Sequence, residues 1–299
     1  AHFPDRLAVV FSQHGVRWTW RELQATVDRH AAALHRLGLV QGDRLGIWSP
    51  NRAEWLVTML ATARLGVILV NINPAYRVSE LEYAINKAGL KALVTAAQFK
   101  SSDYLAMLRT LAPELDACRP GELRSARLPE LRLVIRLGDV TTPGMMNWGE
   151  LDALADTAGV RAALAATDGD VLVFLPGRRE IERSAVALSD LDSGATLQPH
   201  QAINVQFTSG TTGHPKGATL THFNIVNNAV CVGAAMRLGV DDRLAIPVPL
   251  YHCFGMVMGV LVCLSSGAAM VFPSEGFDAG LTLTAVAAER CTALHGVPT

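Results

Sequence analysis

The stretch Ile203-Asn-Val-Gln-Phe-Thr208-Ser-Gly-Thr-Thr-Gly-His-Pro-Lys216-Gly217 joins a short apolar run to a loop of glycines, hydroxyl side chains and one lysine. The run 203–207 predicts a strand, and the sequence from Thr221 predicts a helix. Glycine lets a backbone turn tightly and bring its N–H groups close to an anion. The hydroxyls add donors, and Lys216 adds positive charge. The sequence therefore predicts a polyphosphate-binding loop between a strand and a helix.

The spacing of this loop excludes the commonest phosphate-binding motif. A Walker loop needs G-x-x-x-x-G-K-[ST]. Here the position five after Gly210 is Pro215, and Lys216 is followed by Gly217 rather than by a hydroxyl residue. The alternative to phosphate binding is a Gly/Ser/Thr-rich surface loop without a ligand. The strand before the loop and the expected helix after it favour phosphate binding.

The motif T-S-G-T-T-G-x-P-K-G resembles the signature loop of the AMP-forming acyl-CoA synthetases, a superfamily that includes luciferases and peptide-synthetase adenylation domains. Four further stretches are similar to the same family: 42–51, 71–76, 218–224 and 247–255. The resemblance covers residues 1–150 and 200–299 and is closest to the medium-chain fatty acyl branch.

The resemblance implies a reaction in two steps. A fatty acid carboxylate attacks the α-phosphorus of ATP to give an acyl-adenylate and pyrophosphate, and the thiol of coenzyme A then displaces AMP. It implies that Mg²⁺ accompanies the phosphates, near Thr211 and Thr212, and that Lys216 and His252 are catalytic. The residues implied to bind the nucleotide are Thr208, Ser209, Gly210, Thr211, Thr212, Gly213, His214, Pro215, Lys216 and Gly217.

The acyl substrate is expected to bind beside the family-like stretch that contains His252. The residues implied are His252, Phe254, Gly255, Met256, Gly296 and Val297. For His252 the alternative is a hydrogen-bonded core or turn histidine. Met256, Met258 and Val260 could line an apolar tunnel for the acyl chain, and the alternative for these three is a helix face in the core. His214 and His222 are expected to be exposed, in a loop and at a helix start.

The fold class expected is α/β, with largely parallel sheets covered by helices, since strand and helix patterns alternate. The resemblance implies the large N-terminal domain of the acyl-adenylate-forming fold, incomplete here. Asn51 is the expected N-cap of the helix that ends near Leu65. Ser79 and Glu82 are expected to form the capping box of the next helix along the chain. Strands are expected at 7–11, 16–20, 45–48, 67–72, 90–95, 131–137, 244–248, 268–272 and 291–294, and helices at 21–37, 148–155, 221–238, 255–264 and 279–289.

Two family-like parts are expected, 1–160 and 201–299, on either side of a segment of different character, 161–200. Within it, Gly169–Arg183 is similar to a strand–turn–helix segment of DEAH-box RNA helicases. Three interpretations stay open: an inserted strand–helix unit at the sheet edge, a join of unrelated sequence, and a helicase. The last has no Walker loop or Asp-Glu-x-His box to support it.

Composition restricts the partners. The net charge of −1 gives no electrostatic case for nucleic acid or an anionic membrane surface. The five cysteines form no C-x-x-C pair, so we expect small apolar core residues and a cytoplasmic protein. The twenty uncharged residues 253–272 could span a bilayer, but Ser265-Ser-Gly267 favours a buried helix, a turn and a strand. Peripheral membrane association and oligomeric state stay open.

The family's adenine and ribose contacts, its acidic Mg²⁺ ligand and a catalytic lysine lie further along the chain, many of them in a C-terminal lid domain. We therefore expect the first part of a synthetase, with weak or no turnover alone. The alternatives are an adenylating enzyme with another acid or acceptor, and a non-catalytic nucleotide-binding or interaction module.

Overall fold

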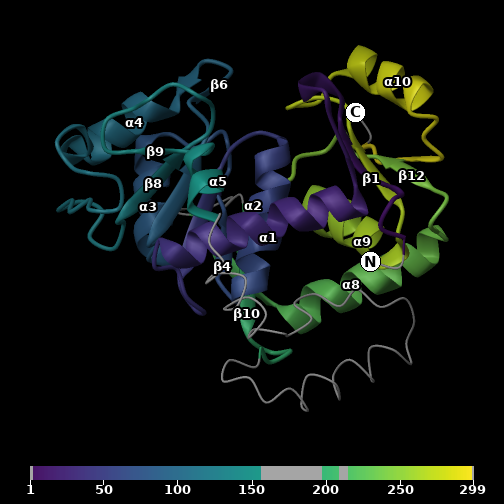
Figure 1. The fold of residues 1–299 in the computed structure, drawn as a ribbon, viewed down its shortest axis with the longest axis horizontal. Coiled ribbons are helices and arrows are strands. Elements are labelled where there is room, and N and C mark those ends of the chain that lie inside the picture. Colours follow the sequence, from purple (N-terminus) through teal and green to yellow (C-terminus); the bar gives the residue numbers. More distant parts are fainter. Residues whose placement is uncertain (1–2, 156–196, 209–214, 298–299) are drawn as a thin grey trace.

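The computed structural model describes residues 3–155, 197–208 and 215–297, and these form two large sheets with helices between and around them (Figure 1). The larger sheet has the strand order β11-β10-β4-β3-β5-β8-β9, parallel except for the pair β10–β11. Its strands are β3 (Arg44–Trp48), β4 (Ile68–Asn71), β5 (Ala92–Thr95), β8 (Leu133–Arg136), β9 (Met146–Asn147), β10 (Ala202–Phe207) and β11 (Gly217–Thr221).

The smaller sheet has the order β14-β12-β13-β1-β2, parallel except for β1–β2. Its strands are β1 (Leu7–Phe11), β2 (Val16–Thr19), β12 (Arg243–Ala245), β13 (Ala269–Phe272) and β14 (Ala293–Leu294), and β6 (Gln98–Phe99) with β7 (Ser102–Asp103) forms a separate hairpin. The α/β class with largely parallel sheets is confirmed. Each sheet takes strands from both 1–160 and 201–299, so that division does not coincide with the sheets.

The helices cover both faces of the larger sheet, which explains why its strands read as nearly continuous apolar runs. One core packs α1, α2 and the segment 254–266 between the sheets, and a second packs α3 and α4 on the far face. The helices are α1 (Trp20–Arg36), α2 (Ala53–Leu65), α3 (Val78–Ala88), α4 (Tyr104–Leu111), α5 (Glu150–Ala155), α8 (His222–Met236), α9 (Val262–Ser266) and α10 (Ala279–Ala288), with 3₁₀ turns η1 (Ser12–His14) and η2 (Pro113–Asp116).

Two predicted helix starts are wrong. Arg52, not Asn51, is the N-cap of α2, because the Asn51 side chain binds the main chain of a distant segment instead. α3 begins at Val78, and the Arg77 N–H donates to Glu80 (3.1 Å). Glu82 pairs with Arg127 and takes no part in capping.

The helix expected after the phosphate loop begins where it was predicted, but a strand that the sequence analysis did not predict, β11, precedes it. β11 pairs with β10 immediately beyond the loop, and only then does α8 begin. The N-cap prediction at Thr221 is confirmed, because its Oγ1 accepts a hydrogen bond from the Asn224 N–H (3.2 Å). β11 forms the edge of the sheet, and its first three residues are exposed.

The long uncharged stretch folds as buried helix, turn and strand, as predicted. Its first part, η3 (Phe254–Leu261), is a π-helix, and α9 continues it to a turn at Gly267, where φ is 77°. None of the helices in the described part of the chain is long and apolar enough to cross a membrane. A π-helix of this length is rare, and such segments often lie at functional sites.

The cysteine prediction is wrong for most of the five. Cys263 is buried, Cys118 and Cys291 are half-buried, and Cys231 and Cys253 are exposed.

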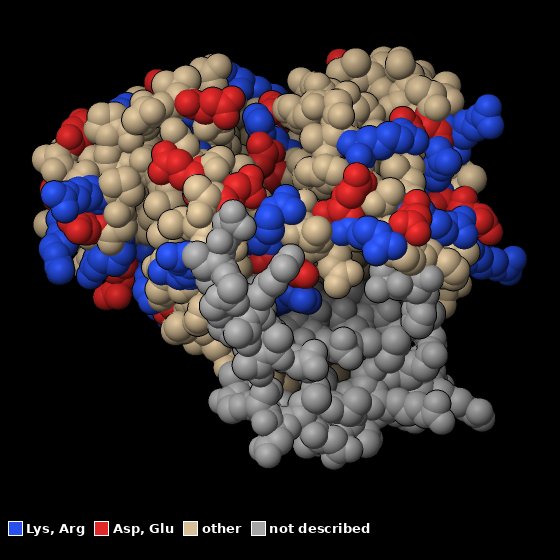
Figure 2. Space-filling model, in the orientation of Figure 1, with Lys and Arg blue, Asp and Glu red and all other residues tan. Residues whose placement is uncertain are grey.

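The segment 161–196 lies outside the described residues, so the structure tests none of its three interpretations. On the face shown in Figure 2, basic and acidic side chains are interspersed.

Candidate functional site

The predicted phosphate loop leaves the larger sheet from an antiparallel hairpin. Phe207 pairs with Gly217 at the end of the β10–β11 ladder, and the Thr208 N–H donates to the Lys216 carbonyl (2.9 Å). The side chains of Thr208 and Lys216 are exposed. Ser209, Gly210, Thr211, Thr212, Gly213 and His214 lie outside the described residues, so the structure describes the neck of the loop: Thr208, Pro215, Lys216 and Gly217.

This hairpin separates the loop from the start of the next helix. A loop between a strand and a helix could use the positive end of the helix. Here α8 starts only after the five residues of β11. Stabilisation of a bound phosphate must therefore come from loop N–H groups, hydroxyls and the Lys216 ammonium group.

Three amide side chains on β4 and β10 form a row that runs from the core towards the loop; we call Asn71, Asn204 and Gln206 the amide row. Asn204 and Gln206 share a face because side chains alternate along a strand, and Gln206 pairs in register with Asn71. The Asn204 amide donates to the Leu69 carbonyl (3.0 Å) and to Asn71 Oδ1 (3.1 Å). Sequence reasoning missed this row, although alternation along 203–207 could have indicated it.

The amide row touches the segment that carries His252. Asn71 Nδ2 donates to the Tyr251 carbonyl (3.1 Å) and lies 3.5 Å from Met256 Sδ. Gln206 Nε2 lies 3.8 Å from the same sulfur. The strands β4 and β10, the second of which leads to the neck of the loop, therefore contact the residues that flank His252.

His252 lies exposed in the turn two residues before η3, so the core alternative does not apply and the turn alternative describes its backbone. Its N–H donates to the Pro249 carbonyl (3.2 Å), and its carbonyl accepts from the Met256 N–H (3.0 Å). Its Nδ1 accepts from the Phe254 N–H (3.1 Å). A neutral ring therefore carries its proton on Nε2, which makes Nε2–H a hydrogen-bond donor.

Asn51 holds the segment before His252, which sequence reasoning missed. This buried side chain donates to the Val248 carbonyl (2.9 Å) and accepts from the Leu250 N–H (2.8 Å). Gly255 packs against the same segment, since a Cβ there would lie 2.3 Å from the Pro249 carbonyl oxygen. The similarity of the stretch 42–51 to the synthetase family was the signal that could have marked Asn51.

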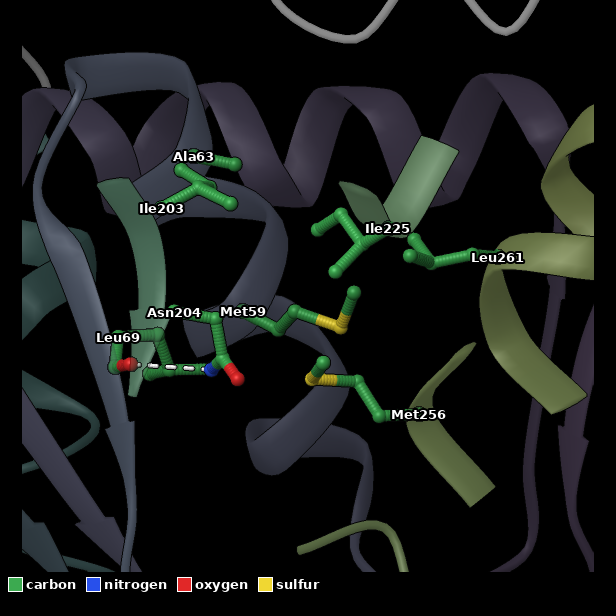
Figure 3. A pocket seen from close by; sticks show the side chains of 8 residues that line it. All are labelled: Met59, Ala63, Leu69, Ile203, Asn204, Ile225, Met256 and Leu261. Carbon is green, nitrogen blue, oxygen red and sulfur yellow. Dashed lines mark hydrogen bonds between the residues drawn. The ribbon is translucent and has the colours of Figure 1, made fainter. Parts of the chain in front are cut away.

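Met256 and Val260 are buried, as the core alternative predicts, and Met256 also lines a small cavity (Figure 3). The cavity measures about 10 Å³, room for about one water molecule. It lies between the larger sheet, α2, α8 and η3. Its lining is Met59, Ala63, Leu69, Ile203, Asn204, Ile225, Met256 and Leu261.

Gly296 and Val297 are exposed and follow a buried histidine that the sequence analysis did not select. His295 Nε2 donates to the Met258 carbonyl (2.9 Å), and its ring lies 4.8 Å from that of Phe254. These contacts attach the chain after β14 to η3. Burial lowers the pKa of His295.

His222 is not exposed, contrary to expectation. It begins α8 as predicted, but it is half-buried, and burial lowers its pKa. Its Nε2 is buried without a hydrogen-bond partner in the described structure. His214 lies outside the described residues.

The described residues contain no group of three or more His, Cys, Asp and Glu that could hold a metal ion. Mg²⁺ commonly binds through substrate phosphates with only one or two protein ligands. The predicted hydroxyl contacts, Thr211 and Thr212, lie outside the described residues.

Comparison with known proteins identifies the family. The model of the AMP-binding enzymes matches residues 1–299. The chain belongs to the AMP-binding enzyme family. It is 41% identical over 301 residues to the mitochondrial medium-chain acyl-CoA ligase ACSF2 of Danio rerio, an alignment that covers 99% of this chain and 45% of that protein. The resemblance to AMP-forming acyl-CoA synthetases is thus confirmed, and the chain spans about half the length of the curated relatives it matches.

Solved structures of this family share the fold. The anthranilate CoA ligase AuaEII in complex with anthranoyl-AMP matches with a TM-score of 0.74 at 18% identity, covering 99% of this chain and 47% of that one. ATP-bound MatB from Rhodopseudomonas palustris matches with a TM-score of 0.66 at 24% identity, with coverage of 99% and 47%. At these identities the similarity supports the fold of the N-terminal domain.

Proposed function

We propose that this chain forms the acid- and phosphate-binding part of a fatty acid–CoA ligase that uses ATP and releases AMP and pyrophosphate. The observation that carries the proposal is the contact of Asn71 with both Tyr251 and Met256, which places His252 beside the strands that lead to the phosphate loop. An acid held at His252 would lie close to a nucleotide held at Lys216. The similarity to ACSF2 supports a fatty acid as the acid.

The chemistry assigned to the site is nucleophilic attack followed by loss of pyrophosphate. A carboxylate oxygen of the fatty acid forms a bond to the α-phosphorus of ATP, and the bond from that phosphorus to the bridging oxygen breaks. In this proposal His252 Nε2–H donates to the second carboxylate oxygen. Lys216 balances charge on the leaving pyrophosphate, which grows as the bond breaks. Mg²⁺, when bound, neutralises part of the same charge.

The loop residues outside the described part of the chain complete the proposal. Gly210 and Gly213 are predicted to allow the turn, and the hydroxyls of Ser209, Thr211 and Thr212 are predicted to donate to the outer phosphates. Coenzyme A is the acceptor of the acyl group in the second step. The cytoplasmic location stays a prediction.

Acid-dependent ATP–pyrophosphate exchange tests the proposal, carried out on the protein as its gene encodes it. A panel of fatty, aromatic and dicarboxylic acids separates a fatty acid ligase from adenylating enzymes with other acids. We expect exchange with fatty acids and thioester formation when coenzyme A is added. ATP binding without exchange for any acid would identify a non-catalytic nucleotide-binding module and overturn the proposal.

A further inference from the structure

One face of the smaller sheet is thinly covered. Side chains alternate along its strands, so that Val9 and Met270 belong to the core between the two sheets, whereas Val10 and Val271 belong to a small cluster beneath α10. From α10, Ala285 joins this small cluster. A groove of about 400 Å³ is left between α10 and the hairpin of β1 and β2. Its size is that of a site for a small molecule.

The helix α10 gives this groove an uncharged wall. Its ten residues contain no ionisable side chain, although most of them are exposed. A helix of such composition is normally buried, and an exposed apolar face often marks a binding groove. Apolar side chains that line the groove include Val10, Phe11, Leu281 and Ala288. From Leu281 to Glu289 the groove follows the helix for about 12 Å.

The groove contains an arginine with unused hydrogen-bond donors. Arg17 Nη1 donates to both carboxylate oxygens of Glu289 (2.9 and 2.8 Å), and the Arg17 side chain is 52% exposed. Arg243 Nη1 lies 3.7 Å from the same carboxylate. Two guanidinium groups therefore share one carboxylate, which leaves one positive charge in excess among these three groups. The Nε and Nη2 atoms of Arg17 have no hydrogen-bond partner among the described residues.

We propose that this groove binds an aliphatic carboxylic acid, with its carboxylate on Arg17 and its hydrocarbon chain along α10. The carboxylate accepts hydrogen bonds from Nε and Nη2, the planar pair of donors that arginine presents to a carboxylate. The excess positive charge favours an anion over an uncharged ligand. The chain lies against Leu281 and Ala288, and each buried methylene raises the affinity about fourfold.

This site is separate from the candidate site at His252. The π-helix η3, which follows His252, packs in the core on the opposite face of the smaller sheet. Binding in the groove therefore does not depend on the proposed function.

Methyl NMR tests the proposal, on the protein as its gene encodes it and titrated with decanoate below its micelle concentration. The Leu281 methyl groups report binding in the groove, and decanol is the uncharged ligand with the same chain. Ala288→Phe fills the groove. Ala287→Phe is the matched control, because Ala287 is exposed on the same helix but does not line the groove. Arg17→Gln removes the charge, and thermal unfolding checks that each variant folds.

We expect decanoate to shift the Leu281 methyl signals to saturation. Decanol should bind about tenfold more weakly, and Arg17→Gln should weaken decanoate binding by the same factor. Ala288→Phe should abolish the shift, and Ala287→Phe should keep it.

Equal affinities of the unmodified protein for decanoate and decanol would overturn the proposal, and this comparison needs no variant to fold. Leu281 signals that do not respond to decanoate, or that respond equally in Ala287→Phe and Ala288→Phe, would also overturn it. Each of these results leaves the proposed function intact, because that function is read from pyrophosphate exchange.

Discussion

The Oδ1 atom of Asn51 accepts a hydrogen bond from the Leu250 N–H at 2.8 Å, across 199 residues of sequence. Its Nδ2 donates to the Val248 carbonyl (2.9 Å), so a single amide satisfies two main-chain groups of the segment that leads to His252. Asn51 follows β3 of the larger sheet, whereas residues 248–250 follow β12 of the smaller one. This side chain therefore fixes the candidate site to both sheets.

Asn51→Ala should destabilise the chain and displace His252. Two buried main-chain groups would lose their partner, at a cost of about 1–3 kcal/mol for each group. Urea unfolding measures the loss, and the NMR shifts of the His252 imidazole report its displacement. Asn227→Ala is the control, because in the described part of the chain the Asn227 amide donates to the Phe223 carbonyl within its own helix, α8. Unchanged His252 shifts in folded Asn51→Ala would contradict the positioning role.

The prediction that failed at Asn51 shows what sequence patterns do not contain. The alternation of strands and helices gave the class and most elements, because periodicity is local. Whether an asparagine caps the next helix or bonds across the molecule depends on which segment lies beside it. The amide row is of the same kind: Asn71 and Gln206 meet only through the register of β4 with β10.

The loop neck shows a second limit. The predicted strand before the phosphate loop and the predicted helix from Thr221 are both present, but residues 217–221 between the loop and the helix form an edge strand on β10 that the sequence analysis did not predict. These five residues show little apolar periodicity, so the sequence alone does not distinguish them from a loop that connects two elements. The burial of His222 was missed because it depends on tertiary packing, which local sequence patterns do not contain.

Lys216→Ala should abolish most adenylation without loss of the fold. The side chain is exposed at the neck of the loop, so its removal leaves the core intact. Loss of a group that stabilises transition-state charge typically lowers kcat by about 10²–10³-fold. Pyrophosphate exchange measures the effect, with Lys87→Ala, an exposed lysine on α3, as the control. Equal exchange rates in the two variants would remove Lys216 from the proposed mechanism.

The five cysteines should react with iodoacetamide in the order of their exposure. Cys231 and Cys253 are exposed and should be alkylated first in the native protein. Cys263 should react last, because it is buried and burial raises its pKa, which disfavours the reactive thiolate. Peptide mass spectrometry gives the time course, and labelling in urea gives the reference for each site. Early alkylation of Cys263 in folded protein would contradict the packing of α9.

Gly255→Ala should disturb the turn that carries His252. A Cβ at this position would lie 2.3 Å from the Pro249 carbonyl oxygen, a main-chain atom that cannot move without shifting residues 249–252. Overpacking of this kind costs about 1–3 kcal/mol. Gly296→Ala is the matched control, because a Cβ there meets nothing within 4 Å. Denaturant unfolding of both variants makes the comparison, and equal midpoints would show that the turn tolerates a side chain.

Acid should destabilise the chain through His30, which packs in the α1–α5 interface. Its Nδ1–H donates to the Thr26 carbonyl (2.9 Å), its ring stacks on Trp148 (4.5 Å), and its Nε2 is buried without a partner in the described structure. Burial lowers the pKa of His30 below its ordinary value of 6.5. The folded state therefore binds fewer protons than the unfolded state below about pH 6.5, so stability falls as the pH decreases from there towards the lowered pKa.

His30→Phe keeps the stacking and removes the proton site, so its free energy of unfolding should fall less steeply from pH 7 to pH 5 than that of the unmodified chain. Equilibrium unfolding at both pH values measures the two slopes; parallel slopes would show that the acid sensitivity comes from His222, His295 or another group.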